Sequence, residues 1–159
     1  MGMRKWTSLL AFLVICYAVE VIGGLFTSSS VHSWYPTLAK PGWNPPAWVF
    51  APVWTLLYTM IAFAGWLIYL LPKTPLRSGA LTIYGIQLFL NLIWSGVFFG
   101  LQSPLMGLIE ILILWGMIAV NITLFWILRR LAGLLLLPYI LWVSYAVTLT
   151  AAIWVYNRA

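Results

Sequence analysis

The sequence predicts an all-α integral membrane protein, a bundle of five transmembrane helices in a single domain over residues 1–159. Hydrophobic residues make up 64% of the chain and charged residues only 6%, whereas a soluble domain is about half apolar and about a quarter charged. A chain of 159 residues has too little interior to hide so much apolar surface from water. Apolar runs long enough to cross a bilayer, joined by short polar turns, account for almost the whole sequence.

The first expected span covers residues 6–26 and follows Arg4 and Lys5. Residues 27–45 form the longest polar stretch of the chain and contain several prolines. Because proline fixes φ and removes a backbone donor, this stretch predicts an ordered, non-helical loop outside the bilayer.

Four further spans are expected over residues 46–71, 78–100, 105–128 and 131–156. Prolines or paired arginines mark the turns between them: Pro72 and Pro75, then Pro104, then Arg129 and Arg130. The short turns predict that consecutive spans run antiparallel to one another.

Cations are unevenly divided between the two sides of this bundle. Lys40 and Arg158 fall on the side of the long loop, and all others fall on the side of the N-terminus: Arg4, Lys5, Lys73, Arg77, Arg129 and Arg130. The positive-inside rule then predicts a cytoplasmic N-terminus, with loop 27–45 and the C-terminus outside. The same rule explains the net charge of +6 without a nucleic-acid partner, which we do not expect.

The sequence lacks the residues that several kinds of catalytic and metal site require. Cys16 is the only cysteine and His32 the only histidine, so we predict no metal site of clustered ligands and no internal disulfide. Neither a Ser-His-Asp set nor a Gly-rich phosphate loop is visible. Hydrolytic and nucleotide chemistry are therefore not expected.

Polar and aromatic side chains recur at helical spacing in three spans. Gln87, Asn91 and Ser95 share one face of the third span, and aromatic residues line faces of the second and fifth, among them Trp54, Tyr58, Tyr139 and Trp142. One interpretation is contact between helices, with amides and hydroxyls bonding across the interface. The other is an aromatic-walled pocket with a few polar groups. Periodicity alone favours the first.

Three ionisable residues stay open at this stage. Glu20 and Glu110 lie within spans, where a carboxyl group is a functional candidate, although we favour structural roles for both. We interpret His32 as a solvated loop residue.

Gly96 and Gly100 form a G-x-x-x-G pair that allows close helix contact, and such pairs also occur in dimers.

A motif at the end of the long loop resembles a known family. The sequence Trp34-Tyr35, then Lys40-Pro41-Gly42-Trp43-Asn44-Pro45-Pro46, then Trp48 and Trp54, resembles the signature of the TspO/MBR family. This family comprises tryptophan-rich sensory proteins and the animal translocator protein, also called the peripheral-type benzodiazepine receptor. Further matches follow at Asn91, Trp94-Ser95, Pro138-Tyr139, Trp142 and Ala146.

The resemblance implies a five-helix membrane protein, commonly a homodimer, and here one of a bacterial cell membrane. It implies that the first loop closes over a pocket, with porphyrin or haem as the ligand and no required cofactor. Synthetic isoquinoline or benzodiazepine compounds are implied ligands too. Cholesterol is doubtful, since Val155 abuts Tyr156 without the spacer of the sterol pattern.

Matching positions give the candidate site. The expected ligand-binding residues are Tyr35, Pro45, Phe50, Trp54, Tyr58, Asn91, Trp94, Ser95, Trp142 and Ala146. Thr150 departs from the family, which commonly has Asn there. No histidine is expected to face the interior, which favours metal-free porphyrin, or haem without a strong axial ligand.

Three functions are considered. The first is a membrane receptor or sensor for tetrapyrroles. The second is light-dependent degradation of protoporphyrin IX, with Trp54 and Trp142 as candidate catalytic residues. The third is transport of tetrapyrroles or sterols, for which the sequence offers no inverted repeat.

Overall fold

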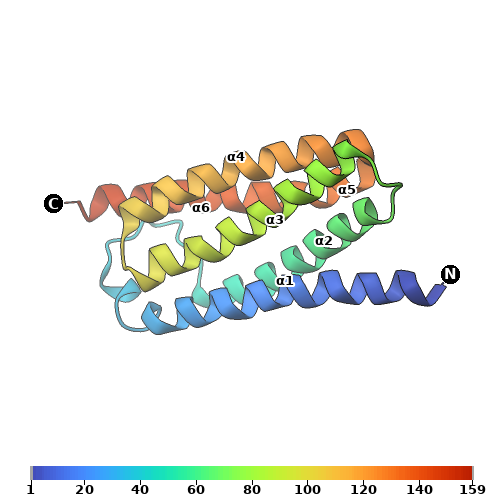
Figure 1. Ribbon diagram of the computed structural model, residues 1–159. Coiled ribbons are helices and arrows are strands. Elements are labelled where there is room, and N and C mark those ends of the chain that lie inside the picture. The colour runs from blue at the N-terminus through green and yellow to red at the C-terminus, as the bar shows by residue number, and fades with distance from the viewer. Residues whose placement is uncertain (1, 159) are drawn as a thin grey trace.

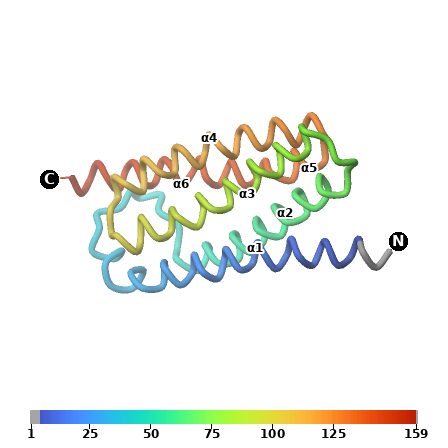
Figure 2. The backbone as a smooth tube through the Cα atoms, in the orientation of Figure 1, coloured from blue at the N-terminus to red at the C-terminus, as the bar shows by residue number. Residues whose placement is uncertain are grey.

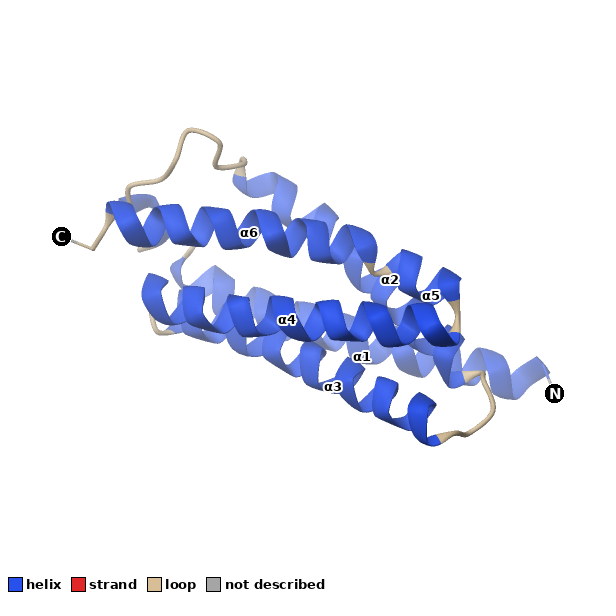
Figure 3. Ribbon diagram, turned by 90° about the horizontal axis from the view of Figure 1, so that it is seen from above, coloured by secondary structure: helices blue, strands red, loops and turns tan. Residues whose placement is uncertain are grey.

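The computed structural model of this protein describes residues 2–158, and these residues form helices, turns and loops with no strand among them (Figures 1 and 3). The α-helices are α1 (Gly2–Ser30), α2 (Phe50–Tyr69), α3 (Pro75–Ser95), α4 (Pro104–Leu128), α5 (Arg130–Leu135) and α6 (Leu137–Tyr156). Short 3₁₀ turns cover Tyr35–Thr37 and Ala47–Val49, and a π-turn covers Gly96–Gly100.

The predicted fold class is confirmed. In the described part of the chain, five helical segments are long and apolar enough to cross a membrane: Lys5–Ser30, Ala47–Tyr69, Pro75–Gly100, Pro104–Leu128 and Arg130–Tyr156. The last of them consists of α5 and α6, which meet at Leu136. Pro138 follows this break, and its missing N–H cannot bond to the carbonyl one turn earlier.

Helix α1 extends beyond the predicted span, so the prediction that the loop begins at residue 27 is wrong. Hydroxyl groups at the end of α1 bond to carbonyls of their own helix: Thr27 to Gly23 at 3.0 Å and Ser28 to Leu25 at 2.9 Å. These bonds satisfy the hydroxyl groups within their own helix, so these polar residues can extend α1. We call residues 31–46 the lid.

Two helices begin at residues that cap them. Thr74 accepts a hydrogen bond from the backbone N–H of Arg77 at 3.1 Å, so α3 starts three residues before the predicted position. Ser103 accepts from the N–H of Met106 at 3.4 Å at the start of α4. In both helices proline occupies the first position, where its missing donor costs no intrahelical bond.

The helices pack in a ring in which α2, α1, α3, α4 and α6 follow one another. Helix α2 also packs on α5 but has few contacts with α6. The ring is thus closed at the end that holds the N-terminus and looser at the other end. The lid crosses that looser end, beside the C-terminus (Figure 2).

Glycine permits the closest approach between helices at one point in the core. A Cβ atom on Gly65 of α2 would lie 2.6 Å from a ring atom of Tyr84 and 2.8 Å from one of Phe12. Both rings belong to neighbouring helices, α3 and α1. No side chain larger than hydrogen fits there unless these rings move.

The Gly96 and Gly100 pair faces α1 of the same chain. A Cβ atom added at either position would meet the ring of Phe26, at 3.9 Å and 3.7 Å respectively. The pair therefore serves a contact within the bundle, and a homodimer stays a prediction from the family resemblance.

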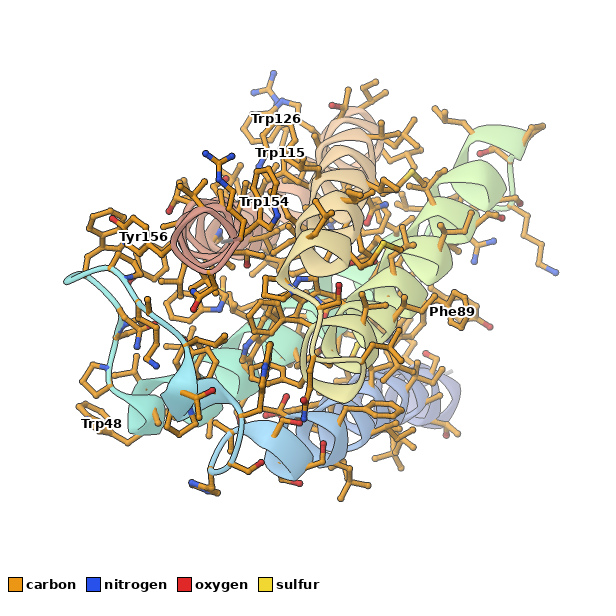
Figure 4. The ribbon with its side chains drawn as sticks, turned by 90° about the vertical axis from the view of Figure 1, so that its left-hand side faces the viewer. Trp48, Phe89, Trp115, Trp126, Trp154 and Tyr156 are labelled. Atoms are coloured by element: carbon orange, nitrogen blue, oxygen red, sulfur yellow. The ribbon has the colours of Figure 1, made fainter. Side chains whose placement is uncertain are left out.

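Many large aromatic side chains point away from the bundle. Figure 4 shows this arrangement for Trp48, Phe89, Trp115, Trp126 and Tyr156. Trp48 and Phe89 are 74% and 62% exposed, which suits contact with lipid and with its interface. These residues account for part of the tryptophan excess, and the remainder lies inside.

Candidate ligand-binding cavity

A cavity of about 570 Å³ lies inside the bundle beneath the lid. Residues from α1, the lid, α2, α3 and α6 line it. The structure places every sequence-predicted ligand residue on its wall: Tyr35, Pro45, Phe50, Trp54, Tyr58, Asn91, Trp94, Ser95, Trp142 and Ala146. These ten residues, which belong to the lid, α2, α3 and α6, thus surround one cavity.

Aromatic rings form a large part of the wall. The rings of Trp54 and Tyr58 lie 5.5 Å apart, and Phe50 meets Trp142 edge to face at 6.0 Å. Trp94 stacks on Phe98 with ring centroids 5.3 Å apart. Such contacts fix the orientation of each ring, so the wall is largely formed before any ligand arrives.

A chain of hydrogen bonds forms the inner end of the cavity, which we call the floor. The Tyr58 hydroxyl donates to Asn91 Oδ1 at 2.8 Å. Asn91 Nδ2 donates to the Tyr139 hydroxyl at 2.7 Å, and that hydroxyl donates to Gln87 Oε1 at 2.9 Å. The chain joins α2, α3 and α6 and satisfies polar groups that would be costly to bury alone.

The polar stripe on α3 combines helix contact with a position on the cavity wall, and Asn91 takes part in both. Asn91 and Ser95 line the cavity, whereas Gln87 is fully buried below it. Gln87 serves helix contact alone, Asn91 serves both, and Ser95 lies on the cavity wall.

The lid is ordered by its own polar contacts. The Tyr35 hydroxyl donates to Asn44 Oδ1 at 2.7 Å, and burial raises the pKa of Tyr35 to about 12, so this hydroxyl keeps its proton at neutral pH. The Lys40 ammonium donates to the carbonyls of Tyr35 and Leu38 at 2.7 and 2.9 Å. It also lies 4.9 Å from the centre of the Tyr35 ring.

Further bonds attach the lid to the bundle. Asn157, just after α6, receives the Ala39 N–H on its Oδ1 and donates its Nδ2 to the Ala39 carbonyl, both at 2.9 Å. The Tyr145 hydroxyl donates to the Trp43 carbonyl at 2.5 Å. The lid is therefore held over the cavity from the side of α6.

Replacing Asn157 with leucine is expected to loosen the lid. Two hydrogen bonds of about 0.7 kcal/mol each would be lost at an exposed site, so amide exchange over residues 31–46 should accelerate about tenfold. Hydrogen–deuterium exchange with mass spectrometry measures this rate. Asn157→Asp keeps the acceptor and should give a smaller effect; equal rates in all three proteins would contradict the role of Asn157.

Two residues of the cavity lining were not among the ligand-binding residues predicted from the sequence. Glu20 lines the cavity from α1 and accepts a hydrogen bond from the Thr55 hydroxyl at 2.5 Å. His32 lines it from the lid, so the expectation that no histidine faces the interior is wrong. The spacing of Glu20, Gly23, Gly24 and Thr27 on one face of α1 was the signal for Glu20. His32 lies beyond the end of α1, so this spacing says nothing about its direction.

The structure also gives the positions of Thr150 and Glu110, whose roles the sequence did not decide. Thr150 lies on the cavity wall and is buried. Glu110 lies outside the cavity lining, on α4, and its buried carboxyl oxygens have no hydrogen-bond partner among the described residues. Within residues 2–158, no three His, Cys, Asp or Glu side chains gather into a metal-binding group.

At Trp142 a single layer of side chains separates the cavity from a groove on the outside of the bundle. Trp142 and Tyr145 line the cavity and also border an apolar groove of about 370 Å³ outside it. Residues of α2 and α6 complete this groove: Val53, Leu56, Leu57, Pro138 and Leu141. Leu56 and Leu141 are 61% and 69% exposed, so the groove faces lipid.

Comparison with known proteins gives consistent matches along the chain. A family model described as "TspO/MBR family" matches residues 12–155. The "Tryptophan-rich protein TspO" of Chlorobaculum tepidum is 42% identical over 152 residues, which cover 91% of this chain and 92% of that protein. The protein of the same name from Archaeoglobus fulgidus is 42% identical, with 94% and 96% covered. The human "Translocator protein" is 30% identical, with 94% and 89% covered.

Proposed function

The chain belongs to the TspO/MBR family of membrane proteins, and from the cavity beneath its lid we propose that it is a receptor or sensor for tetrapyrroles such as protoporphyrin IX and haem. The observation that carries this proposal is the lining: Trp54, Trp94 and Trp142 all border one cavity inside a bundle that spans the membrane.

The physical match is between a flat, apolar ring and aromatic walls. A volume of about 570 Å³ falls within the usual range for small-molecule sites, roughly 300–1,000 Å³. Tryptophan and tyrosine rings offer stacking surfaces for a π-system. Polar groups near the lid can meet the carboxylates at the ring edge: Thr27, Ser28, His32, Asn44 and Ser95. Ligand occupancy would then act on the lid, which closes over the same space.

Titration with protoporphyrin IX tests this proposal. We expect micromolar porphyrin to quench tryptophan fluorescence, because three tryptophans border the cavity, and we expect cholesterol to have no effect. Ala146→Phe should abolish quenching by filling the cavity. The matched control Val120→Phe adds the same ring on the exposed surface of α4 and should leave quenching intact. Quenching by sterol and none by porphyrin would overturn the ligand assignment.

Light-dependent degradation of the bound porphyrin is a second candidate, favoured by the position of both Trp54 and Trp142 on the cavity wall. These side chains would donate electrons to an excited porphyrin, with dioxygen as the oxidant. The double variant Trp54→Phe/Trp142→Phe should then bind porphyrin but preserve its absorbance under illumination. Trp115→Phe/Trp126→Phe changes two outward-facing tryptophans and serves as the control. Unchanged degradation in the first variant would exclude this role.

Other features of the proposal follow from the family and the charge pattern. We infer that the N-terminal end faces the cytoplasm, since Lys73, Arg77, Arg129 and Arg130 lie in the turns or in the first turn of a helix at that end of the bundle. Isoquinoline and benzodiazepine compounds would use the same cavity, which needs no further cofactor. Transport would require the closed end, where α2 packs on α5, to open; uptake into sealed proteoliposomes would test for it.

A further inference from the structure

A carboxyl group lies on the cavity wall within the membrane-spanning part of α1. Glu20 belongs to the span Lys5–Ser30 and lines the cavity. Among the side chains that the structure describes, Thr55 alone forms a hydrogen bond with it. A carboxyl group at membrane depth is costly, so such groups face protein or a cavity and commonly serve a function. One bond from a hydroxyl leaves acceptor capacity free on this side chain.

Glu20 lies at the inner end of the cavity. It precedes Ser30 by ten residues of continuous helix, which places it roughly 15 Å from the lid along α1. Its partner Thr55 comes one helical turn before Tyr58, which belongs to the floor. His32 lines the cavity from the lid itself. The lining that the structure describes thus carries its only carboxyl group at the inner end and its only imidazole at the outer end.

Because Glu20 and His32 lie at opposite ends of the cavity, a ligand with charged groups at one edge would bind more favourably in one orientation than in the other. A ligand carboxylate next to Glu20 would meet a like charge away from bulk water, where repulsion is strong. A ligand N–H or ammonium group there would find an acceptor, with the rings of Trp54 and Tyr58 close by. At the lid, an imidazole N–H can donate to a carboxylate.

We propose that Glu20 sets the charge preference of the cavity, so that a tetrapyrrole lies with its carboxylates toward His32 and the lid and with a neutral or hydrogen-bond-donating edge toward Glu20. This inference rests on the proposed function. It adds that a ligand of the same shape with ammonium groups in place of the carboxylates turns those groups toward Glu20.

Three ligands with one ring system test the preference: protoporphyrin IX, its dimethyl ester, and its diamide bearing terminal ammonium groups. Glu20→Gln keeps the size of the side chain and an oxygen for Thr55. We expect this variant to bind the cationic diamide about tenfold more weakly than the unmodified protein. It should bind the dicarboxylate several-fold more tightly and the ester unchanged. Melting temperatures in detergent confirm that each variant is folded.

Two further variants separate this role from general effects. Glu110→Gln removes the other intramembrane carboxyl group, which lies outside the cavity lining, and should change none of the three affinities. His32→Gln should weaken the dicarboxylate and leave the ester unchanged. Equal shifts for all three ligands in Glu20→Gln, or no shift, would overturn the role of Glu20 while leaving porphyrin binding in place. If the unmodified protein binds none of the ligands, the proposed function and this inference both fail.

Discussion

Replacing Gly65 with leucine is expected to prevent the bundle from assembling. Even a Cβ atom at this position would lie within 3 Å of the rings of Tyr84 and Phe12, and both rings are confined between α1, α2 and α3. Overpacking of a well-packed core costs about 1–3 kcal/mol for small additions, so Gly65→Ala should already lower the melting temperature. The larger leucine should leave little protein that elutes as a single species from size-exclusion chromatography in detergent.

The matched control for this prediction is Gly85→Leu. A Cβ atom on Gly85 of α3 would meet nothing within 4 Å, and this glycine is exposed. The same substitution should therefore be tolerated there. Leucine also has a higher helix propensity than glycine, by less than about 1 kcal/mol, and this difference applies equally at both positions. If both leucine variants yield the same amount of folded protein, the close approach at Gly65 does not limit assembly.

Replacing Asn91 with leucine is expected to lower both stability and ligand affinity. The Asn91 amide accepts from Tyr58 and donates to Tyr139, so its loss leaves two buried hydroxyl groups without this partner. Each unsatisfied buried group costs about 1–3 kcal/mol, although hydrogen bonds between membrane helices average less, roughly 0.6 kcal/mol. We expect a loss of about 2 kcal/mol in unfolding free energy, measured by denaturation in mixed micelles, and weaker porphyrin quenching.

Asn121→Leu separates the two effects of the Asn91 substitution. Asn121 is fully buried on α4 and donates to the Ala80 carbonyl at 3.2 Å, but it lies outside the cavity lining. Its replacement should reduce stability and leave the affinity of the folded protein for porphyrin unchanged. Equal losses of affinity in both variants would mean that Asn91 acts on binding only through stability.

The sequence predicted the helical spans well because long apolar runs are required to cross a bilayer. It was less reliable at the ends of helices, where single side chains decide. Thr27 and Ser28 were assigned to a loop from their polarity, yet their hydroxyls bond to the helix they extend. The cap at Thr74 likewise moved the start of α3. Such bonds depend on local geometry that composition does not reveal.

The cavity was predictable in part. Helical spacing placed Asn91 and Ser95 on one face with Gln87, but it could not tell a face on a neighbouring helix from a face on an empty space. The family motif supplied that distinction for the ten expected residues. Glu20 and His32 were missed because their directions depend on the rotation of α1 and on the path of the lid, and neither follows from the motif.

The attachment of Asn157 to Ala39 has a practical consequence for experiments on this protein. Because the residue just after α6 holds the lid by two bonds, anything anchored beyond it exerts its force on the cover of the cavity. An affinity tag, a fused fluorescent protein or a biosensor surface joined at that end would change the binding kinetics it is meant to report. The opposite end of the chain, remote from the lid in Figure 1, is the better handle.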